Sequence, residues 1–292
     1  MFSQRYLART ITCSSYLRDW AISRGHSPSR IGVVKLGIEI ADFVPPDETA
    51  RDSAKNELLG VGPSITVIAI VARLDPQKRP IMVPDIADQL KSMGATNFII
   101  VMLGDGDLLV PLKARIESLK VSSLVWPLGT VNEPQNYLRA ADIFLLPSLS
   151  EGISIAVAEA MAMGLPVVTA RAGALPEQLG EIGNWDPTRL SGILVNHTLD
   201  NVIDAGMYAE ELYVLLHDEQ LRQAYGNRAR RNVENTFDWR TTLRGMFSEV
   251  EKASNLAEGE RVGLPHPASY LAAQTLLMEA SRETDFALGY GR

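Results

Sequence analysis

The sequence has few residues of the kinds that form disulfides, metal centres or redox sites. Cys13 is the single cysteine among 292 residues, which excludes an internal disulfide framework and a cysteine-rich metal site. The histidines are isolated and show no metal-ligand spacing, so we predict no bound metal; they are His26, His197, His217 and His266. A single cysteine also fits a reducing compartment, and we predict a cytoplasmic location.

Long hydrophobic runs are missing as well. The longest uninterrupted apolar segments, Val67 to Ala72 and Phe98 to Leu103, have the length of strands. A helix that crosses a bilayer needs roughly 20 apolar residues, so we predict no integral membrane segment. A net charge of −7 disfavours nucleic acid as a partner, because phosphate binding needs a basic surface. Hydrophobic residues make up 46% of the chain, which is ordinary for a globular protein.

Several catalytic and nucleotide motifs are absent. The sequence contains no Walker A motif and no G-x-S-x-G elbow, which disfavours an ordinary P-loop ATPase and an α/β-hydrolase. Gly104 and Gly106 begin a G-x-G-x-x-G pattern, but position 109 is a leucine. An NAD-linked oxidoreductase is therefore disfavoured. The better interpretation of Gly104 is a tight turn close to a ligand.

Apolar strand patterns alternate with helical patterns from Ser64 onward. The predicted strands are 65–71, 98–103, 124–126, 143–146, 166–169 and 192–195. The predicted helices are 81–93, 108–120, 133–140, 153–163, 201–216 and 219–235. This alternation predicts an α/β fold, a doubly wound, Rossmann-like parallel sheet with helices on both faces.

The segments outside this alternation show weaker strand and helix patterns. Residues 8–40 indicate strand, helix and strand, whereas 44–56 is polar, contains Pro45-Pro46 and is interpreted as a linker or surface loop. Helices are also predicted from Trp239 to about Ala253 and over 269–280, the latter without a role. The predicted domain boundaries are 1–43, 44–60, 61–236 and 237–292.

Four loops follow predicted strands, at 72–79, 104–107, 127–131 and 147–154, and parallel strands bring such loops to one edge of a sheet. Arg73 and Lys78 lie in the first of them. An arginine fork and a mobile lysine charge suit a diphosphate. The alternative is a solvated basic loop that pairs with Asp75, and this motif alone leaves the two readings about even.

Two glutamates, Glu151 and Glu159, lie eight residues apart across a strand-to-helix junction. Gly152 permits close approach of a ligand, and the N–H groups of Ile153 and Ser154 at the helix start can receive an anion or a sugar hydroxyl. Glu159 follows about two turns later in an otherwise apolar helix, where an unpaired acid is costly to bury. The alternatives are a helix cap at Glu151 and a surface acid at Glu159; we favour ligand binding.

Together these motifs resemble the retaining nucleotide-sugar glycosyltransferases of family 4, which have the two-domain GT-B fold. The resemblance covers about residues 8–250 and is most specific in the E-x7-E pattern from Glu151 to Glu159. It differs from the family's usual sequence at Ala72, at Leu36-Gly-Ile-Glu39 and at Gly152-Ile-Ser154. Supporting segments are ARLDPQK (72–78), VMLGDGDL (101–108), PLGTV (127–131) and Phe237-Asp-Trp239.

The resemblance implies a role for each site residue. Arg73 and Lys78 would hold the donor diphosphate, and Glu151 would contact the donor sugar. Glu159 would bind the ribose. The backbone of Gly152 to Ser154 would meet sugar or phosphate, and Gly129 with Thr130 would lie near the base. The family transfers a hexose from a UDP-, GDP- or ADP-sugar to a glycan, lipid or small-molecule acceptor, with no metal, no further cofactor and no protein nucleophile.

The resemblance also implies a longer partner segment. Complete members carry an N-terminal acceptor domain, of which residues 1–40 would be only the last strand-helix-strand. We therefore expect a fragment or one half of a split enzyme, with a separate N-terminal half as a possible partner. The alternative function is a non-catalytic nucleotide-sugar-binding or scaffolding subunit.

Overall fold

The computed structural model describes residues 9–180, 190–198 and 200–259, with side chains up to Ser254. It divides into a smaller unit, Met1–Val34 with Leu243–Arg292, and a larger unit, Lys35–Thr242. The predicted helix over 269–280 lies outside the described residues. No helix in the described ranges is long and apolar enough to cross a membrane.

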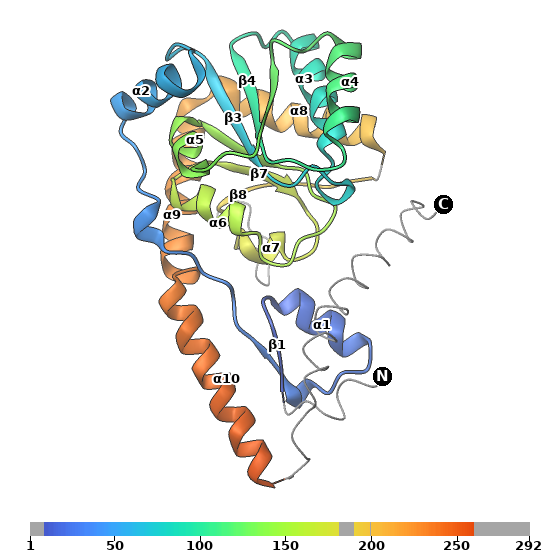
Figure 1. Cartoon of the computed structure of the whole chain (residues 1–292), viewed down its shortest axis with the longest axis vertical. Coiled ribbons are helices and arrows are strands. Elements are labelled where there is room, and N and C mark those ends of the chain that lie inside the picture. The colour runs from blue at the N-terminus through green and yellow to red at the C-terminus, as the bar shows by residue number, and fades with distance from the viewer. Residues whose placement is uncertain (1–8, 181–189, 199, 260–292) are drawn as a thin grey trace. The chain divides into compact units, whose positions relative to one another are not determined.

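The larger unit is built on a parallel sheet of six strands in the order β5-β4-β3-β6-β7-β8 (Figure 1). The strand order reverses between β3 and β6, as a doubly wound sheet requires. The predicted Rossmann-like sheet is therefore confirmed. Its strands are β3 (Thr66–Val71), β4 (Phe98–Leu103), β5 (Val125–Gly129), β6 (Ile143–Leu146), β7 (Val167–Ala170) and β8 (Gly192–Val195).

The strands are buried on both faces, which explains their continuous apolar sequences. On β3, Ile68 and Ile70 belong to the core beneath the helices, while Val67 and Ala69, which point the other way, are equally buried. Pro127 lies in β5, at the edge of the sheet, where its missing N–H interrupts no central ladder.

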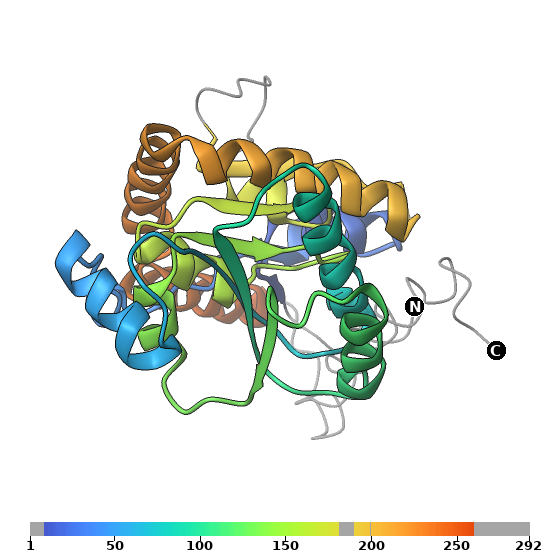
Figure 2. The same cartoon turned by 90° about the horizontal axis from the view of Figure 1, so that it is seen from above.

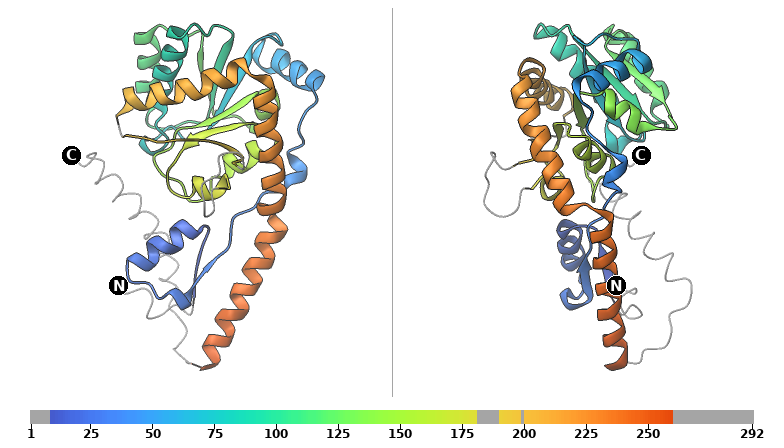
Figure 3. Two further views of the ribbon diagram at one scale, coloured as in Figure 1. Left: turned by 180° about the vertical axis from the view of Figure 1, so that it is seen from behind. Right: turned by 90° about the vertical axis from the view of Figure 1, so that its left-hand side faces the viewer.

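Helices cover both faces of this sheet. The helices α3, α4 and α8 pack together on one face, and α2 and α5 pack together on the other (Figures 1 and 2). The helix α9 follows α8 and packs against α6 (Figure 3). The helices are α2 (Glu48–Leu59), α3 (Val83–Ser92), α4 (Leu109–Leu119), α5 (Pro134–Ala140), α6 (Ile155–Ala162), α7 (Leu175–Gln178), α8 (Asn201–His217) and α9 (Glu219–Thr236), with short 3₁₀ turns η2 (Ile40–Asp42), η3 (Pro76–Lys78) and η4 (Pro80–Met82).

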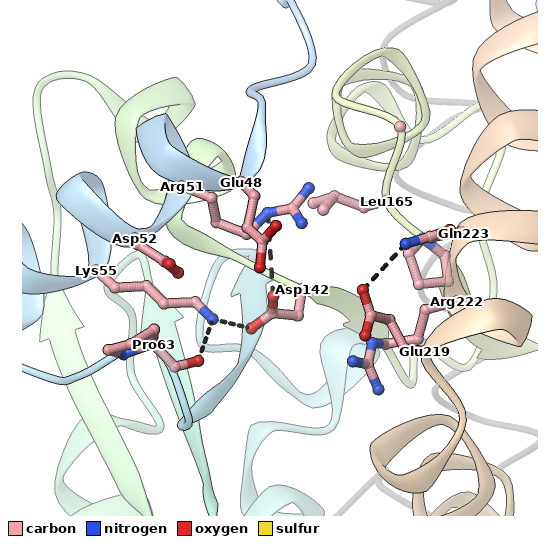
Figure 4. Close-up of a pocket in the computed structure, with 12 residues that line it drawn as sticks. Glu48, Arg51, Asp52, Lys55, Pro63, Asp142, Leu165, Glu219, Arg222 and Gln223 are labelled. Carbon is pink, nitrogen blue, oxygen red and sulfur yellow. Dashed lines mark hydrogen bonds and ion pairs between the residues drawn. The ribbon is translucent and has the colours of Figure 1, made fainter.

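The expected surface loop over 44–56 is wrong, because most of it is the helix α2. Asp47 caps this helix by accepting from the Ala50 N–H at 2.8 Å, and Gly60 ends it in a left-handed conformation. Lys55 points inward from α2, is 3% exposed and pairs with Asp142 at 2.8 Å (Figure 4). The sequence of α2 shows no helical pattern of apolar residues, because the buried residue of this helix is a lysine.

The smaller unit has the predicted strand, helix and strand. The strands β1 (Thr10–Thr12) and β2 (Ile31–Val33) pair in parallel, and Ser14 caps α1 (Ser15–Ser23) through the Leu17 N–H. A 3₁₀ turn, η1 (Pro28–Arg30), leads into β2. The last described helix, α10 (Trp239–Gly259), begins in the larger unit and continues into the smaller one from Leu243. Glu249 on α10 pairs with Arg9, and it takes the space in which Gly32 lacks a side chain.

Candidate functional site

The candidate site lies at the carboxyl edge of the large sheet, where the strand order reverses. The strands on either side of this reversal are β3 and β6. Lys78 is in the loop after β3, and Glu151 is in the loop after β6. Ligands of doubly wound sheets bind in the crevice that forms at such a switch point.

Backbone hydrogen bonds join the four predicted loops at this edge. Leu74 N–H donates to Asp105 O at 3.0 Å, and Gly104 N–H donates to Gly129 O at 2.8 Å. Leu149 N–H donates to Gln77 O at 2.8 Å. The expected convergence of the loops after β3, β4, β5 and β6 is therefore confirmed.

Gly104 makes this convergence possible. Its φ is +129°, and a Cβ added there would lie 2.0 Å from the Ala72 carbonyl oxygen. Any side chain would push the β4 loop away from the β3 loop. The glycine turn identified in the sequence is thus a close backbone contact, which places Gly104 beside the loop that carries Lys78.

The structure brings Lys78 and Glu151 into direct contact as an ion pair. The two side chains are 16% and 8% exposed, so the pair is largely removed from water. In the described part of the chain, Lys78 Nζ and the Glu151 carboxylate make no other hydrogen bond or ion pair. An ammonium has three donors and a carboxylate about four acceptor sites, so both groups keep unused capacity for a ligand.

The helix start beside Glu151 differs from the expectation in two ways. The cap is Ser154, whose side chain accepts from Val157 N–H, and α6 begins at Ile155. The Ser154 N–H is not available to an anion, because it donates to Gln178 Oε1 at 2.9 Å while Gln178 Nε2 donates to Ser154 O at 2.7 Å. The expectation of a free Ser154 N–H is therefore wrong, and so is the Glu151 helix-cap alternative.

The two residues between Glu151 and Ser154 differ in exposure. Gly152 is partly exposed at this turn, whereas Ile153 is buried. The Glu151 backbone is fixed from the next loop along the sheet, because Ala174 N–H donates to Glu151 O at 2.8 Å. A Cβ on Gly173 would lie 2.2 Å from that same oxygen. The carboxylate of Glu151 is thus presented by a rigid turn.

Glu159 lies on α6, half-buried among apolar neighbours. Its carboxylate has no hydrogen-bond or ion-pair partner in the ranges that the structure describes. Burial raises the pKa of the Glu159 carboxyl above its ordinary value, because the charged form loses solvation. A carboxylate that loses solvation without gaining a partner is a candidate for ligand binding.

Arg73, Gly129 and Thr130 are placed at the same edge but are held less firmly. Arg73 is 74% exposed and pairs with Asp75 at 2.9 Å, as the alternative reading of its loop expects. Gly129 ends β5 with φ +74° and open space around it, and Thr130 is exposed. The described residues include no group of three or more His, Cys, Asp or Glu side chains that could hold a metal ion.

The family model described as "Glycosyl transferases group 1" matches residues 60–232. The chain belongs to this family. The glycosyltransferase match includes every predicted site residue, from Arg73 to Glu159.

Curated relatives are also glycosyltransferases. The D-inositol 3-phosphate glycosyltransferase of Segniliparus rotundus is 31% identical over 256 residues, which are 86% of this chain and 53% of that protein. The sulfoquinovosyl transferase SQD2 of Arabidopsis thaliana is 30% identical over 194 residues, covering 66% of this chain and 34% of that protein. The chain thus spans about half the length of the first of these relatives and about a third of the second.

Solved GT-B structures share the fold. Anabaena Alr3699/HepE in complex with UDP superposes with a TM-score of 0.74 at 20% identity, covering 85% of this chain and 65% of that one. WaaG, a glycosyltransferase involved in lipopolysaccharide biosynthesis, gives a TM-score of 0.66 at 18% identity, covering 80% of this chain and 60% of WaaG. These likenesses establish the glycosyltransferase fold.

Sequence reasoning missed two residues that shape the site. Gln77 joins the loops after β3 and β6, since its Nε2 donates to Ser150 O at 2.6 Å. Gln178, on the short helix α7, occupies both backbone groups of Ser154. Gln178 is fully buried, but it follows Glu177 in a mixed segment, so no signal in the sequence distinguishes it.

Proposed function

We propose that this chain carries the donor site of a retaining glycosyltransferase that takes a hexose from a nucleoside diphosphate sugar. The observation that carries the proposal is the buried Lys78–Glu151 pair at the switch point of the sheet, with unused hydrogen-bonding capacity on both partners. The family and the UDP bound in Alr3699/HepE support a nucleotide donor.

Each side chain has a role that suits its surroundings. Lys78 and the exposed Arg73 would hold the diphosphate, because an ammonium and a guanidinium neutralise phosphate oxygens. Glu151 would accept hydrogen bonds from sugar hydroxyls and Glu159 from the ribose diol. Binding would give the Glu159 carboxylate the partners that it lacks in the described residues. The surface at Gly129 and Thr130 would lie near the base, and Gly152 and Ile153 would lie near the sugar.

The reaction would need no protein nucleophile. The bond between the sugar C1 and the phosphate oxygen breaks, and the acceptor oxygen forms a new bond to C1 on the same face. The acceptor proton passes to the departing diphosphate oxygen. Arg73 and Lys78 stabilise the charge that develops on the diphosphate, which is the largest usual contribution of an enzyme to such a step. We propose that these cations make a metal unnecessary.

The acceptor is proposed only by class, as a glycan, lipid or small molecule. The D-inositol 3-phosphate glycosyltransferase of Segniliparus rotundus is about twice as long as its aligned part, so a further polypeptide segment is a proposed partner. The alternative function is a non-catalytic donor-binding subunit, which would retain the Lys78 and Glu151 contacts. It would bind the donor without transferring the sugar.

Calorimetry of the purified chain with UDP, GDP and ADP tests the proposal. We expect one nucleotide to bind and Glu159→Ala to weaken that binding by about 1–3 kcal/mol, the cost of a lost charged hydrogen bond. Glu117→Ala, at an exposed position on α4, is the control and should bind as the unchanged protein does. A folded chain that binds none of the three sinks the proposal. Binding without sugar hydrolysis or transfer indicates the non-catalytic alternative.

A further inference from the structure

Lys78 lies between Gln77 and Arg79, and each of these two residues forms polar contacts with a different part of the larger unit. On one side, Gln77 is hydrogen-bonded to the loop after β6 through Leu149 and Ser150. On the other side, the Arg79 side chain extends to α8. The backbone that carries the Lys78 ammonium is therefore held from both flanks.

Arg79 has a backbone conformation that favours glycine. Its φ is 52° and its ψ is 45°, and among the described residues only Lys120 is another non-glycine with positive φ. This left-handed conformation brings Cβ close to the following carbonyl oxygen, so it needs compensation from elsewhere. It links the two 3₁₀ turns η3 and η4 and ends the loop after Lys78.

The compensation comes from α8. Arg79 Nη2 lies 2.7 Å from Asp204 Oδ2, and the side chains are 5% and 0% exposed. Arg79 Nε and Nη2 also donate to Asn201 Oδ1, at 3.2 and 2.8 Å. Asp204 Oδ2 has no other partner in the described ranges, so the attraction of opposite buried charges joins it to the arginine.

Asp204 is charged at neutral pH. Burial disfavours its charged form, but hydrogen bonds from the Thr198 N–H and hydroxyl, and then from Arg79, outweigh that effect and lower the pKa of Asp204. The Tyr208 hydroxyl, one turn further along α8, is buried without a partner in the described ranges, and burial raises its pKa. Arg79 therefore faces one carboxylate and a neutral phenol.

We propose that Arg79 is a positioning residue for Lys78, a role that rests on the proposed function of Lys78. The ion pair with Asp204 holds the left-handed turn, and the turn directs the Lys78 ammonium at Glu151 and the donor diphosphate. The packing of α8 does not depend on this pair, because α3 and α8 meet through an apolar core that includes Val83, Ala87, Leu90, Ala205, Ala209 and Leu212.

The first test is Arg79→Gly, which accepts the backbone conformation and removes the guanidinium. We expect UDP affinity to fall about ten-fold while cooperative unfolding is retained, since small misplacements of a binding group are costly. Lys120→Gly is the matched control, because Lys120 has nearly the same angles (φ 54°, ψ 44°), carries the same charge and is exposed. It should leave UDP affinity unchanged. Unchanged affinity in Arg79→Gly overturns the proposal.

The second test asks whether Arg79 acts through Lys78. In a Lys78→Ala background, Arg79→Gly should change UDP affinity by less than about two-fold, because the group that it positions is gone. A merely structural residue would weaken binding by the same factor in both backgrounds. That result would overturn the positioning role even if the first test succeeded.

A third measurement needs no nucleotide. The coupling between Lys78 and Glu151 in unfolding is measured with Lys78→Ala, Glu151→Ala and the double variant, with and without Arg79→Gly. We expect Arg79→Gly to reduce this coupling by more than about half, because the pair is no longer aligned. An unaltered coupling overturns the inference. Failure of the unchanged protein to bind any nucleotide would instead sink the proposed function.

Discussion

In the described part of the larger unit, two largely buried lysine–carboxylate pairs lie at opposite edges of the same sheet, and they differ in what surrounds them. At the amino edge, Lys55 pairs with Asp142, Lys55 Nζ also donates to Ile65 O at 3.0 Å, and Asp142 Oδ2 also accepts from Val67 N–H at 2.8 Å. At the carboxyl edge, the Lys78 ammonium and the Glu151 carboxylate have only each other as partners in the described ranges.

The difference separates a structural pair from the pair that we propose binds the donor. The remaining donors and acceptors of the amino-edge pair are largely occupied by backbone, so that pair fixes α2 to the sheet. The carboxyl-edge pair has equal charge and similar burial but unfilled hydrogen-bonding positions. Glu159 adds a half-buried carboxylate without a partner in the described part of the chain. Unused polar capacity, rather than charge alone, distinguishes the candidate site.

The largest expected effect breaks the amino-edge pair. Lys55→Met removes the ammonium that lies 2.8 Å from Asp142 and leaves Arg51 Nε, at 4.0 Å, as the remaining cation beside that carboxylate. We therefore expect a loss of about 3 kcal/mol in the free energy of unfolding by urea, the lower end of the range for a broken buried pair. Adding Asp142→Asn, which can still accept from Val67 N–H, should restore most of the loss. Lys78→Met should cost less, because the Lys78 side chain is 16% exposed against 4% for Lys55, so water can enter the space that its ammonium leaves. Equal losses at the two edges would remove the distinction.

The next effect compares two glycines at opposite ends of β4, Gly94 before the strand and Gly104 after it. Gly104→Ala would place a Cβ 2.0 Å from Ala72 O at φ +129°, whereas Gly94→Ala, at φ +94° before β4, meets nothing within 4 Å. We expect a destabilisation of more than about 2 kcal/mol for Gly104→Ala and about 1 kcal/mol for Gly94→Ala in thermal unfolding. Similar values for both would show that the carboxyl-edge loops are not tightly joined.

A smaller effect, of opposite sign, is expected at Glu159. Its raised pKa means that the folded state favours the protonated form, so the associated stability is present below the unfolded pKa and lost as pH rises through the folded pKa. Glu159→Gln should therefore stabilise the protein at pH 7 by roughly 0.5–1 kcal/mol and have no such effect near pH 3. The same variant should weaken nucleotide binding. A loss of stability at pH 7 would contradict the unpaired, desolvated state.

The smallest effect on stability is expected at Arg73. Its pair with Asp75 is exposed to solvent, so Arg73→Ala should change the free energy of unfolding by less than about 0.5 kcal/mol. Its proposed contact with the diphosphate predicts a measurable loss of UDP affinity in the same calorimetric titration. If affinity is unchanged, Arg73 belongs with the solvated surface and Lys78 alone supplies the charge.

The sequence was sufficient for the elements whose pattern is apolar. The buried strands β3, β4 and β6 were predicted within a residue or two, because a strand covered on both faces must be continuously hydrophobic. The convergence of the loops after them followed from parallel topology. Glu151 and Glu159 stood out because acids are unusual in such surroundings. Their proposed roles still await nucleotide binding.

Tertiary structure alone decided the polar pairings. Lys55, Gln178 and Arg79 read as ordinary polar residues along the chain, yet each is buried because its partner, Asp142, Ser154 or Asp204, comes from a distant segment. Local propensity and periodicity report only neighbours in sequence, whereas a hydrogen bond or ion pair depends on distance in space. The sequence therefore determined the sheet and the convergence of loops at its carboxyl edge. The fold decided which charges are satisfied and which remain available to a ligand.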